Sequence, residues 1–202
     1  MTVRIAFMCE GATEKAFLPV MRQFLVTRLA DRMPKLSSRP SNGRLPKGDR
    51  LKREVELHLK EHDHVIALTD VYTGSDPTEF LDAADARQKM DGWVGGNPRF
   101  HPHAAQYEFE AWLIPYWSRI QNLARSTQKQ PTARPEAINH GNPPSRLLKS
   151  VFETGSVRLS YQKIQRASAI LRDQDLAVAA AACPELKSML NTILILSDGQ
   201  PL

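Results

Sequence analysis

The chain has 202 residues, of which 42% are hydrophobic and 24% are charged. This composition is ordinary for a globular protein and excludes wholesale disorder, and no apolar run approaches the roughly 20 residues of a membrane-spanning helix. The net charge of +5 and the isoelectric point near 9.4 permit an anionic partner such as nucleic acid. Residues 1–9 do not have the pattern of a signal peptide, so we expect a cytoplasmic protein with no membrane contact.

Several common kinds of site are not indicated. Cys9 and Cys183 fit neither a disulfide framework nor a zinc spacing, so we expect reduced thiols. His101 and His103 form a pair without a third ligand at a fixed spacing, so we expect structural or solvent-exposed histidines rather than zinc ligands. The chain has no serine-hydrolase elbow, no dinucleotide-binding fingerprint and no Walker A loop.

The first predicted unit is a strand, a turn and a helix. The apolar run 3–9 stops at Glu10-Gly11, which is typical of a buried strand that ends in a tight turn. We expect Thr13 to cap the following helix, in which apolar residues recur at helical spacing up to Leu29. Together these elements are half of a strand-helix-strand unit.

Residues 33–49 are rich in proline, serine, glycine and basic side chains. We predict a basic loop here; the alternative is a poor edge strand near Leu36. A helix is expected over residues 50–62.

The apolar run 64–70 repeats the opening pattern, because it also stops at an acid, Asp70. We then expect a loop at 73–77, a helix over 78–90, a strand over 99–106 and a helix that begins near Glu108. Beyond Trp117 the pattern is helical, with a proline-rich connector at 128–144. The prediction is a Rossmann-like α/β core in residues 1–117, with a parallel sheet flanked by helices, and a helical extension in 118–202 packed on the same domain.

Acids follow two of the predicted strands. In parallel sheets covered by helices, ligands bind outside the carboxyl ends of the strands, where Glu10 and Asp70 are expected. Two carboxylates at one edge suit a hard cation such as Mg²⁺ or Mn²⁺, which promotes the hydrolysis of phosphate esters. Each acid alone also fits an ordinary turn residue.

Three further glutamates are candidates for the same site. Glu14 lies in the first turn of the predicted helix, where the helix dipole alone could also explain it. Glu108 and Glu110 precede an apolar stretch that favours a helix, so one should face inward and the other solvent. We favour Glu108 as the inward member.

Three motifs carry a resemblance to a known fold family. Residues 10–14 resemble the E-G-x-T-E opening of Toprim-type nucleases related to the OLD and RloB proteins. Residues 70–74 and 107–112 are similar to the D-x-Y-G and H-E-F-E-A-L segments of an uncharacterised bacterial family of that fold, and short likenesses continue to residue 186. The resemblance implies a Toprim-like sheet.

The resemblance also implies roles for individual residues. Its catalytic candidates are Glu10, Asp70, Glu108 and Lys163, with Arg146 a weaker basic candidate. The candidate ligands of the metal are Glu10, Glu14, Asp70, Asp76, Glu108 and Glu110. Two positions depart from the pattern: Tyr72 stands where the second Asp of D-x-D would be, and Tyr107 stands in place of a histidine.

The sequence therefore predicts a metal-dependent nuclease. Relatives of this kind often act in antiphage defence with an ABC-type or AAA-type ATPase, so the resemblance implies such a partner. The alternative is a non-catalytic Toprim subunit that senses nucleic acid or a nucleotide, and a primase-like or phosphatase activity is a third possibility. The choice between DNA and RNA stays open.

Overall fold

The structure is a computed structural model. It describes residues 2–41, 43–72, 79–138, 141–158 and 160–202, and the side chains of residues 12–16 are also outside the description. The elements in chain order are β1 (Arg4–Cys9), α1 (Ala12–Leu29), η1 (Ala30–Arg32), β2 (Lys35–Pro40), α2 (Gly48–His58), β3 (His64–Asp70), α3 (Ala83–Val94), β4 (Phe100–Ala105), η2 (Phe109–Tyr116), α4 (Trp117–Ala124), η3 (Pro135–Ala137), α5 (Pro144–Thr154), α6 (Lys163–Leu171), α7 (Leu176–Ala182) and α8 (Pro184–Leu196).

The four strands form one parallel sheet in the order β2-β1-β3-β4. From β1 the chain crosses outward to β2 on one side, and from β3 it crosses to β4 on the other. The strand order therefore reverses between the central strands β1 and β3, which is the switch point where open α/β sheets bind ligands.

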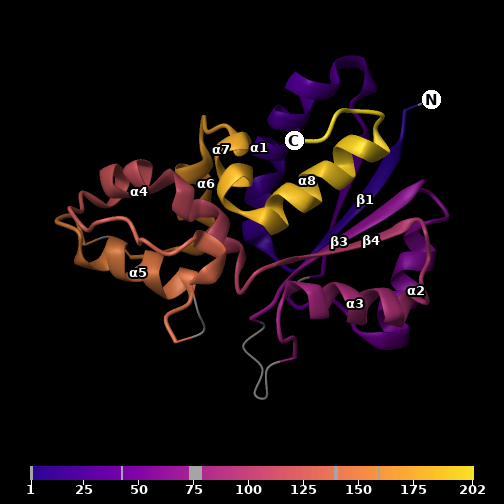
Figure 1. The fold of residues 1–202 in the computed structure, drawn as a ribbon, viewed down its shortest axis with the longest axis horizontal. Coiled ribbons are helices and arrows are strands. Elements are labelled where there is room, and N and C mark those ends of the chain that lie inside the picture. Colours follow the sequence, from indigo (N-terminus) through magenta and orange to yellow (C-terminus); the bar gives the residue numbers. More distant parts are fainter. Residues whose placement is uncertain (1, 42, 73–78, 139–140, 159) are drawn as a thin grey trace.

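Alternation along the strands divides the core between the two faces of the sheet. Ile5, Phe7 and Cys9 belong to a large core shared with α1 and the helices after β4, whereas Ala6 and Met8 belong to a smaller core shared with α2 and α3. Because both faces are covered, the central strands are apolar throughout, as is usual for parallel strands. Figure 1 shows α2 and α3 on one side of the sheet and α1 and α8 on the other.

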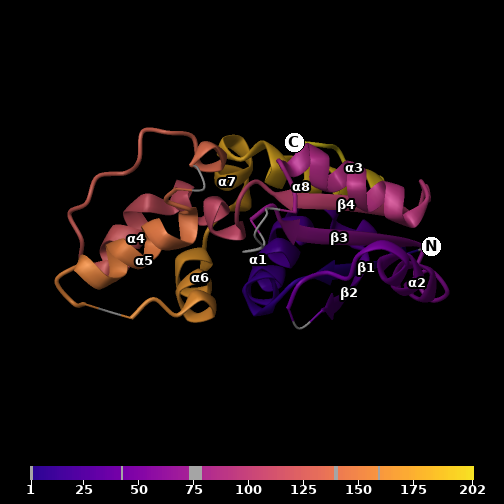
Figure 2. The same ribbon diagram turned by 90° about the horizontal axis from the view of Figure 1, so that it is seen from below.

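The helices after β4 occupy two positions. Helices α4, α5 and α6 lie together beyond the carboxyl ends of the strands (Figures 1 and 2), while α8 returns to contact β4. Helix α6 also contacts α1, and α7 contacts η2. One hydrophobic core thus takes side chains from both sides of residue 117, and the predicted domain division there stays a prediction. Within the described chain, no helix is long and apolar enough to cross a membrane.

The predicted strands at 3–9, 64–70 and 99–106 and the helix at 50–62 are confirmed to within a few residues. The preference for a loop over residues 33–49 was wrong in part, because Lys35–Pro40 is the edge strand β2. Pairing with β1 supplies its backbone hydrogen bonds despite the poor strand propensity, and the end of an edge strand tolerates Pro40.

Two helix starts and one helix type differ from the prediction. Helix α1 begins at Ala12, one residue before the predicted cap Thr13. Helix α3 begins at Ala83, later than predicted, because the carboxylate of Asp82 caps it by accepting from the N–H of Asp85 at 2.8 Å. The segment after Glu108 is a 3₁₀ helix, η2, and contains Pro115.

Each edge strand of the sheet has a feature that reduces its free backbone hydrogen-bonding groups. The edge strand β4 contains Pro102, which has no N–H to donate, and Arg87 of α3 pairs with Glu185 of α8 next to this edge strand. On the opposite edge, Arg22 of α1 donates to the backbone oxygen of Leu36 in β2 at 2.7 Å.

Candidate active site

Glu10 directly follows β1 and is only partly buried. The hydroxyl of Thr69, on the neighbouring strand β3, donates a hydrogen bond to its Oε1. The register explains this contact, because Cys9 pairs with Leu68 and the next two positions, Glu10 and Thr69, come side by side. The first acid of the motif is therefore oriented by a side chain of the central strand.

Asp70 is the last residue of β3. Consecutive strand residues point to opposite faces, so Asp70 lies on the other face from Thr69 and Glu10. Its Oδ1 accepts a hydrogen bond of 2.8 Å from the backbone N–H of Phe109, the first residue of η2. The carboxylate thereby satisfies one of the backbone donors left unpaired at the start of a helix.

The chain between β4 and η2 is held against the end of β3. The N–H of Tyr72 donates to the backbone oxygen of Tyr107 at 2.7 Å, and Tyr107 has a left-handed backbone with φ of 65°. A left-handed conformation is unfavourable for a tyrosine and persists where the surroundings impose it. This turn brings Glu108 and Glu110 next to the end of β3.

Glu108 is buried and has two contacts with one residue. Its Oε2 accepts from the N–H of Ser145 at 2.7 Å, and its Oε1 accepts from the hydroxyl of Ser145 at 2.8 Å. Ser145 is the second residue of α5, where backbone N–H groups have no partner within the helix and the dipole favours a negative charge. Glu108 thus fixes the start of α5 to the sheet.

Glu110 is the most buried of the candidate acids whose side chains the structure describes, with 1% of its surface exposed. Its Oε1 lies 3.0 Å from Nζ of Lys163, the first residue of α6, in an ion pair. Tyr161 is also near, and its buried hydroxyl has no hydrogen-bond partner among the described residues. Glu108, Glu110, Ser145, Tyr161 and Lys163 therefore form a cluster, which we call the inner cluster.

Burial and charge shift the proton affinities of the inner cluster. Burial raises the pKa of Glu110, even though the nearby ammonium of Lys163 opposes the shift. Burial lowers the pKa of Lys163, but the carboxylates of Glu110, Glu108 and Asp70 outweigh it and raise the pKa overall. Burial and the same two glutamates raise the pKa of Tyr161. Asp70 is therefore close enough to Lys163 to add to the rise of its pKa.

The prediction that only one of Glu108 and Glu110 faces inward was wrong, since both are buried. Glu108 precedes η2 in an extended conformation, so the spacing of an α-helix does not apply to the pair. In addition, α5 and α6 cover this end of the sheet and give each glutamate a partner. The side chain of Glu14 is outside the description, and Asp76 lies outside the described residues altogether.

The oxygen donors fit a hard cation in kind. One oxygen each of Glu10 and Asp70 is oriented by a hydrogen bond, a common arrangement around metal ligands. Among the described residues, however, no three His, Cys, Asp or Glu side chains are placed to hold one ion. The structure brings Glu108, Glu110 and Lys163 together and leaves Glu10 on the opposite side of the sheet edge.

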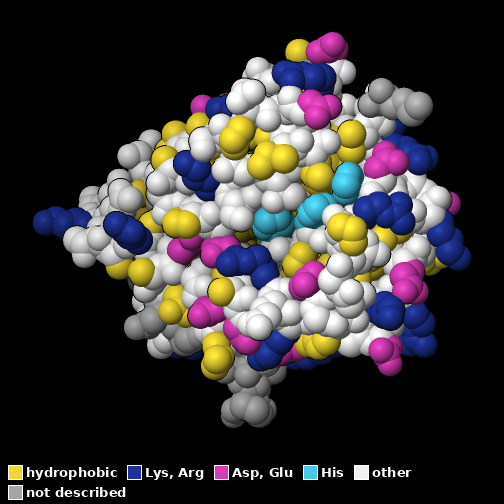
Figure 3. Space-filling view, turned by 45° about the vertical axis from the view of Figure 1, so that its right-hand side comes forward, with side chains coloured by type: hydrophobic (Ala, Val, Ile, Leu, Met, Phe, Trp, Pro, Cys, Tyr) yellow, Lys and Arg dark blue, Asp and Glu magenta, His cyan; other side chains and the backbone are white. Residues whose placement is uncertain are grey.

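Histidine side chains gather on one surface (Figure 3). Nε2 of His101 lies 3.2 Å from Nδ1 of His64, and Nε2 of His103 lies 3.1 Å from the hydroxyl of Thr192. Burial lowers the pKa of His101 to about 4 and that of His103 to about 3, so both rings are neutral at pH 7. These contacts join β3, β4 and α8.

Three residues that contact the candidate acids were given no role in the sequence analysis. Thr69 could have been found by aligning the two apolar runs as adjacent parallel strands, which places it beside Glu10. Ser145 follows Pro144 at a helix start, a position that signals free backbone donors. Nothing in the sequence signals that Tyr161 lies beside Glu110, because this contact depends on how α6 packs.

The architecture and the acids at the strand ends define a parallel α/β protein with a polar site at the carboxyl edge of its sheet. The family described as "Domain of unknown function (DUF4276)" matches residues 9–194, and the chain belongs to this family.

Solved structures show a likeness in fold. The C-terminal region of the Burkholderia pseudomallei OLD protein is 15% identical, with 98% of this chain and 100% of that chain covered and a TM-score of 0.58. The C-terminal region of the Xanthomonas campestris pv. campestris OLD protein is 16% identical, covers 96% of this chain and 95% of that chain, and has a TM-score of 0.45. No match was found among curated proteins. The mixed α/β fold is therefore shared with the first of these structures.

Proposed function

We propose that the protein is a metal-dependent nuclease with a Toprim-type site, in which Glu10 and Asp70 hold Mg²⁺ or Mn²⁺ next to a phosphodiester. The observation that carries the proposal is their position: each follows or ends one of two adjacent central strands, at the switch point of the sheet. The resemblance of residues 10–14 to Toprim-type nucleases and the fold shared with an OLD C-terminal region support it.

The residues of the chain have distinct tasks in this proposal. A bound divalent ion would supply charge neutralisation and an activated water. Thr69 orients Glu10, and the N–H of Phe109 orients Asp70. Glu108 and Glu110 hold α5 and α6 beside the site, and Lys163 supplies a positive charge near Asp70. Glu14 and Asp76 are the proposed sources of further oxygen ligands.

The test is cleavage of plasmid, single-stranded DNA and transfer RNA by the purified protein with Mg²⁺ or Mn²⁺. We expect Glu10→Gln and Asp70→Asn each to lower the rate by about 100-fold or more, the range for loss of an essential acid or metal ligand. Glu56→Gln, at an exposed site on α2, is the matched control and should cut at the wild-type rate. Cutting that survives both active-site changes would refute the proposal.

A second candidate is a non-catalytic subunit that binds nucleic acid or a nucleotide. Tyr72 in place of the second Asp of D-x-D favours it, as does the engagement of Glu108 and Glu110 by Ser145 and Lys163. Calorimetric titration with Mn²⁺ separates the two candidates: saturable binding that Asp70→Asn removes favours the nuclease, and absence of binding favours the subunit.

The resemblance also suggests a role in antiphage defence with an ABC-type or AAA-type ATPase as partner. This proposal rests on the resemblance to Toprim-type nucleases alone. Co-purification of the tagged protein with an ATPase from its native host, and loss of phage protection in Glu10→Gln, are the results that would support it.

A further inference from the structure

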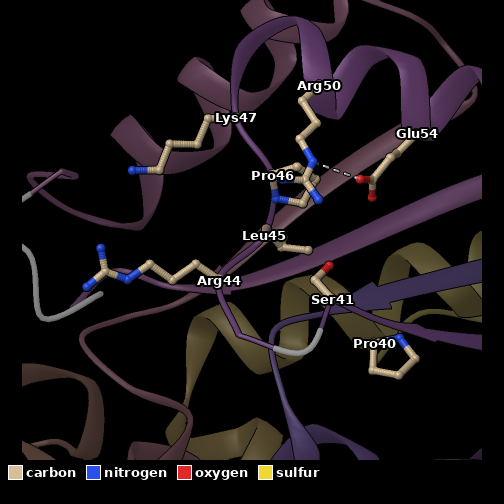
Figure 4. Close-up of a pocket in the computed structure, with 8 residues that line it drawn as sticks. All are labelled: Pro40, Ser41, Arg44, Leu45, Pro46, Lys47, Arg50 and Glu54. Carbon is tan, nitrogen blue, oxygen red and sulfur yellow. Dashed lines mark hydrogen bonds and ion pairs between the residues drawn. The ribbon is translucent and has the colours of Figure 1, made fainter.

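An open cavity of about 540 Å³ lies between the end of β2 and the start of α2. Figure 4 shows its eight lining residues, which we call the basic groove: Pro40, Ser41, Arg44, Leu45, Pro46, Lys47, Arg50 and Glu54. Three of them are basic and one is acidic. Six of the eight residues belong to the basic segment 33–49, to which the proposed function assigns no role, and Arg50 and Glu54 belong to α2.

The three cations of the groove are available to an anion. Arg44 and Lys47 are exposed and extend to the same side in Figure 4, while Arg50 turns toward Glu54 with an N–O distance of 3.3 Å. Lys47 pairs with Glu79. The Arg50–Glu54 pair is exposed and contributes little to stability, so a phosphate can replace this carboxylate at small cost. The carboxylate of Glu79 is mostly buried, so a phosphate would bind Lys47 on its exposed side, beside the existing pair.

The groove is connected to Glu10. The N–H of Ser41 donates to the backbone oxygen of Cys9, and that of Gly43 donates to the backbone oxygen of Glu10, both at 2.9 Å. A second, smaller pocket is lined by Glu10, Thr69, Arg44 and Lys47, among others. The same two cations therefore line both the groove and the immediate surroundings of the first acid.

We propose that the basic groove binds the sugar-phosphate backbone of a nucleic acid strand and leads it to Glu10. The choice of nucleic acid as the polyanion rests on the proposed function, while the groove itself is argued from its charges. None of its eight lining residues is aromatic, so it offers no surface on which bases stack. Contacts to phosphate alone carry no sequence information, and the groove binds without preference for base sequence.

The test is fluorescence anisotropy with labelled 20-nucleotide single strands and duplexes of two unrelated sequences, in EDTA so that no cutting occurs. The variant is Arg44→Gln with Lys47→Gln. The matched control is Lys52→Gln with Lys60→Gln, which removes the same charge from exposed positions outside the groove. All four substitutions are at exposed sites, and circular dichroism verifies the fold.

We expect the groove variant to bind about tenfold more weakly at 0.1 M salt and to lower the slope of log affinity against log salt by about 1.5, the value for two lost phosphate contacts. The control should bind within about twofold of wild type, since distant exposed charges are screened. Equal losses in both variants, no loss in the groove variant, or displacement of the strands by millimolar inorganic phosphate would overturn the proposal.

Failure of this inference differs from failure of the proposed function. Binding that depends on the groove without any cleavage in Mg²⁺ or Mn²⁺ would refute the nuclease and leave the groove standing. Cleavage that Glu10→Gln abolishes but the groove variant leaves unchanged would refute the role of the groove and leave the nuclease standing.

Discussion

The carboxylates on the two sides of the carboxyl edge of the sheet differ in burial and in their hydrogen-bond partners. Glu10 is partly exposed, accepts from Thr69 and lies beside a basic groove, whereas Glu108 and Glu110 are buried and connected to α5 and α6. A carboxylate that must bind a ligand needs access, and a carboxylate that holds two helices in place needs satisfied partners. The outer acid thus remains accessible, whereas the two inner acids are engaged by the starts of α5 and α6.

The largest expected effect is on the inner ion pair. Lys163→Met leaves Glu110 buried without a cation, and we expect this to lower the free energy of unfolding by about 2 kcal/mol. The loss is smaller than the roughly 3–5 kcal/mol typical of fully buried ion pairs, because half of the Lys163 side chain is exposed. Urea unfolding at pH 7.5 measures the loss. Glu10→Gln should cost less than about 1 kcal/mol, and a larger cost there than in Lys163→Met would contradict the division between the two sides.

The contact of Glu108 with α5 gives the next effect. Ser145→Ala removes the hydroxyl donor and keeps the backbone donor, so we expect a loss of about 1.5 kcal/mol, as for a hydrogen bond to a charged group. The control Ser150→Ala, on the exposed face of the same helix, should change stability by less than about 0.5 kcal/mol. Equal effects in the two variants would mean that Glu108 does not anchor α5.

Stability against pH tests the burial of Glu110. Because folding raises its pKa, the native state binds the proton more tightly, and this contribution to stability is lost as the pH rises from the ordinary value of 4.5 through the raised one. Glu110→Gln removes the dependence, so the stability of the variant relative to wild type should rise over this window by at most about 1.4 kcal/mol per pH unit. A flat or falling difference between the two unfolding curves would show that Glu110 is not desolvated.

The smallest expected effect is on the outer side. Thr69→Val keeps the shape of the side chain and removes the hydroxyl donor to Glu10, so we expect a loss of about 0.5–1 kcal/mol. In the proposed nuclease the same change should weaken Mn²⁺ binding by about tenfold through loss of orientation. Unchanged Mn²⁺ titration curves would remove Thr69 from the site.

The sequence was sufficient where local pattern decides structure. The apolar runs that end at Glu10 and Asp70 predicted both central strands and their place at the carboxyl edge, because burial on two faces requires continuous apolar residues. It was insufficient where packing between distant segments decides the structure. Residues 35–40 form a strand because they pair with β1, and Glu110 has a partner because α6 places Lys163 beside it. The resemblance extends over the stretches that contain Ser145 and Tyr161, but it gave no role to either residue, because their contacts with Glu108 and Glu110 arise only from the packing of α5 and α6.

Pro102 bears on the tendency of the protein to associate through the edge of its sheet. An exposed edge strand offers a row of unpaired amides to which a second chain can add, the usual route to fibrils and exchanged dimers. In β4 the proline deletes one of these amides, and the Arg87–Glu185 bridge lies beside the same border. Replacing Pro102 with valine would complete the row, and we expect light scattering at high concentration to show more self-association in this variant than in the wild type.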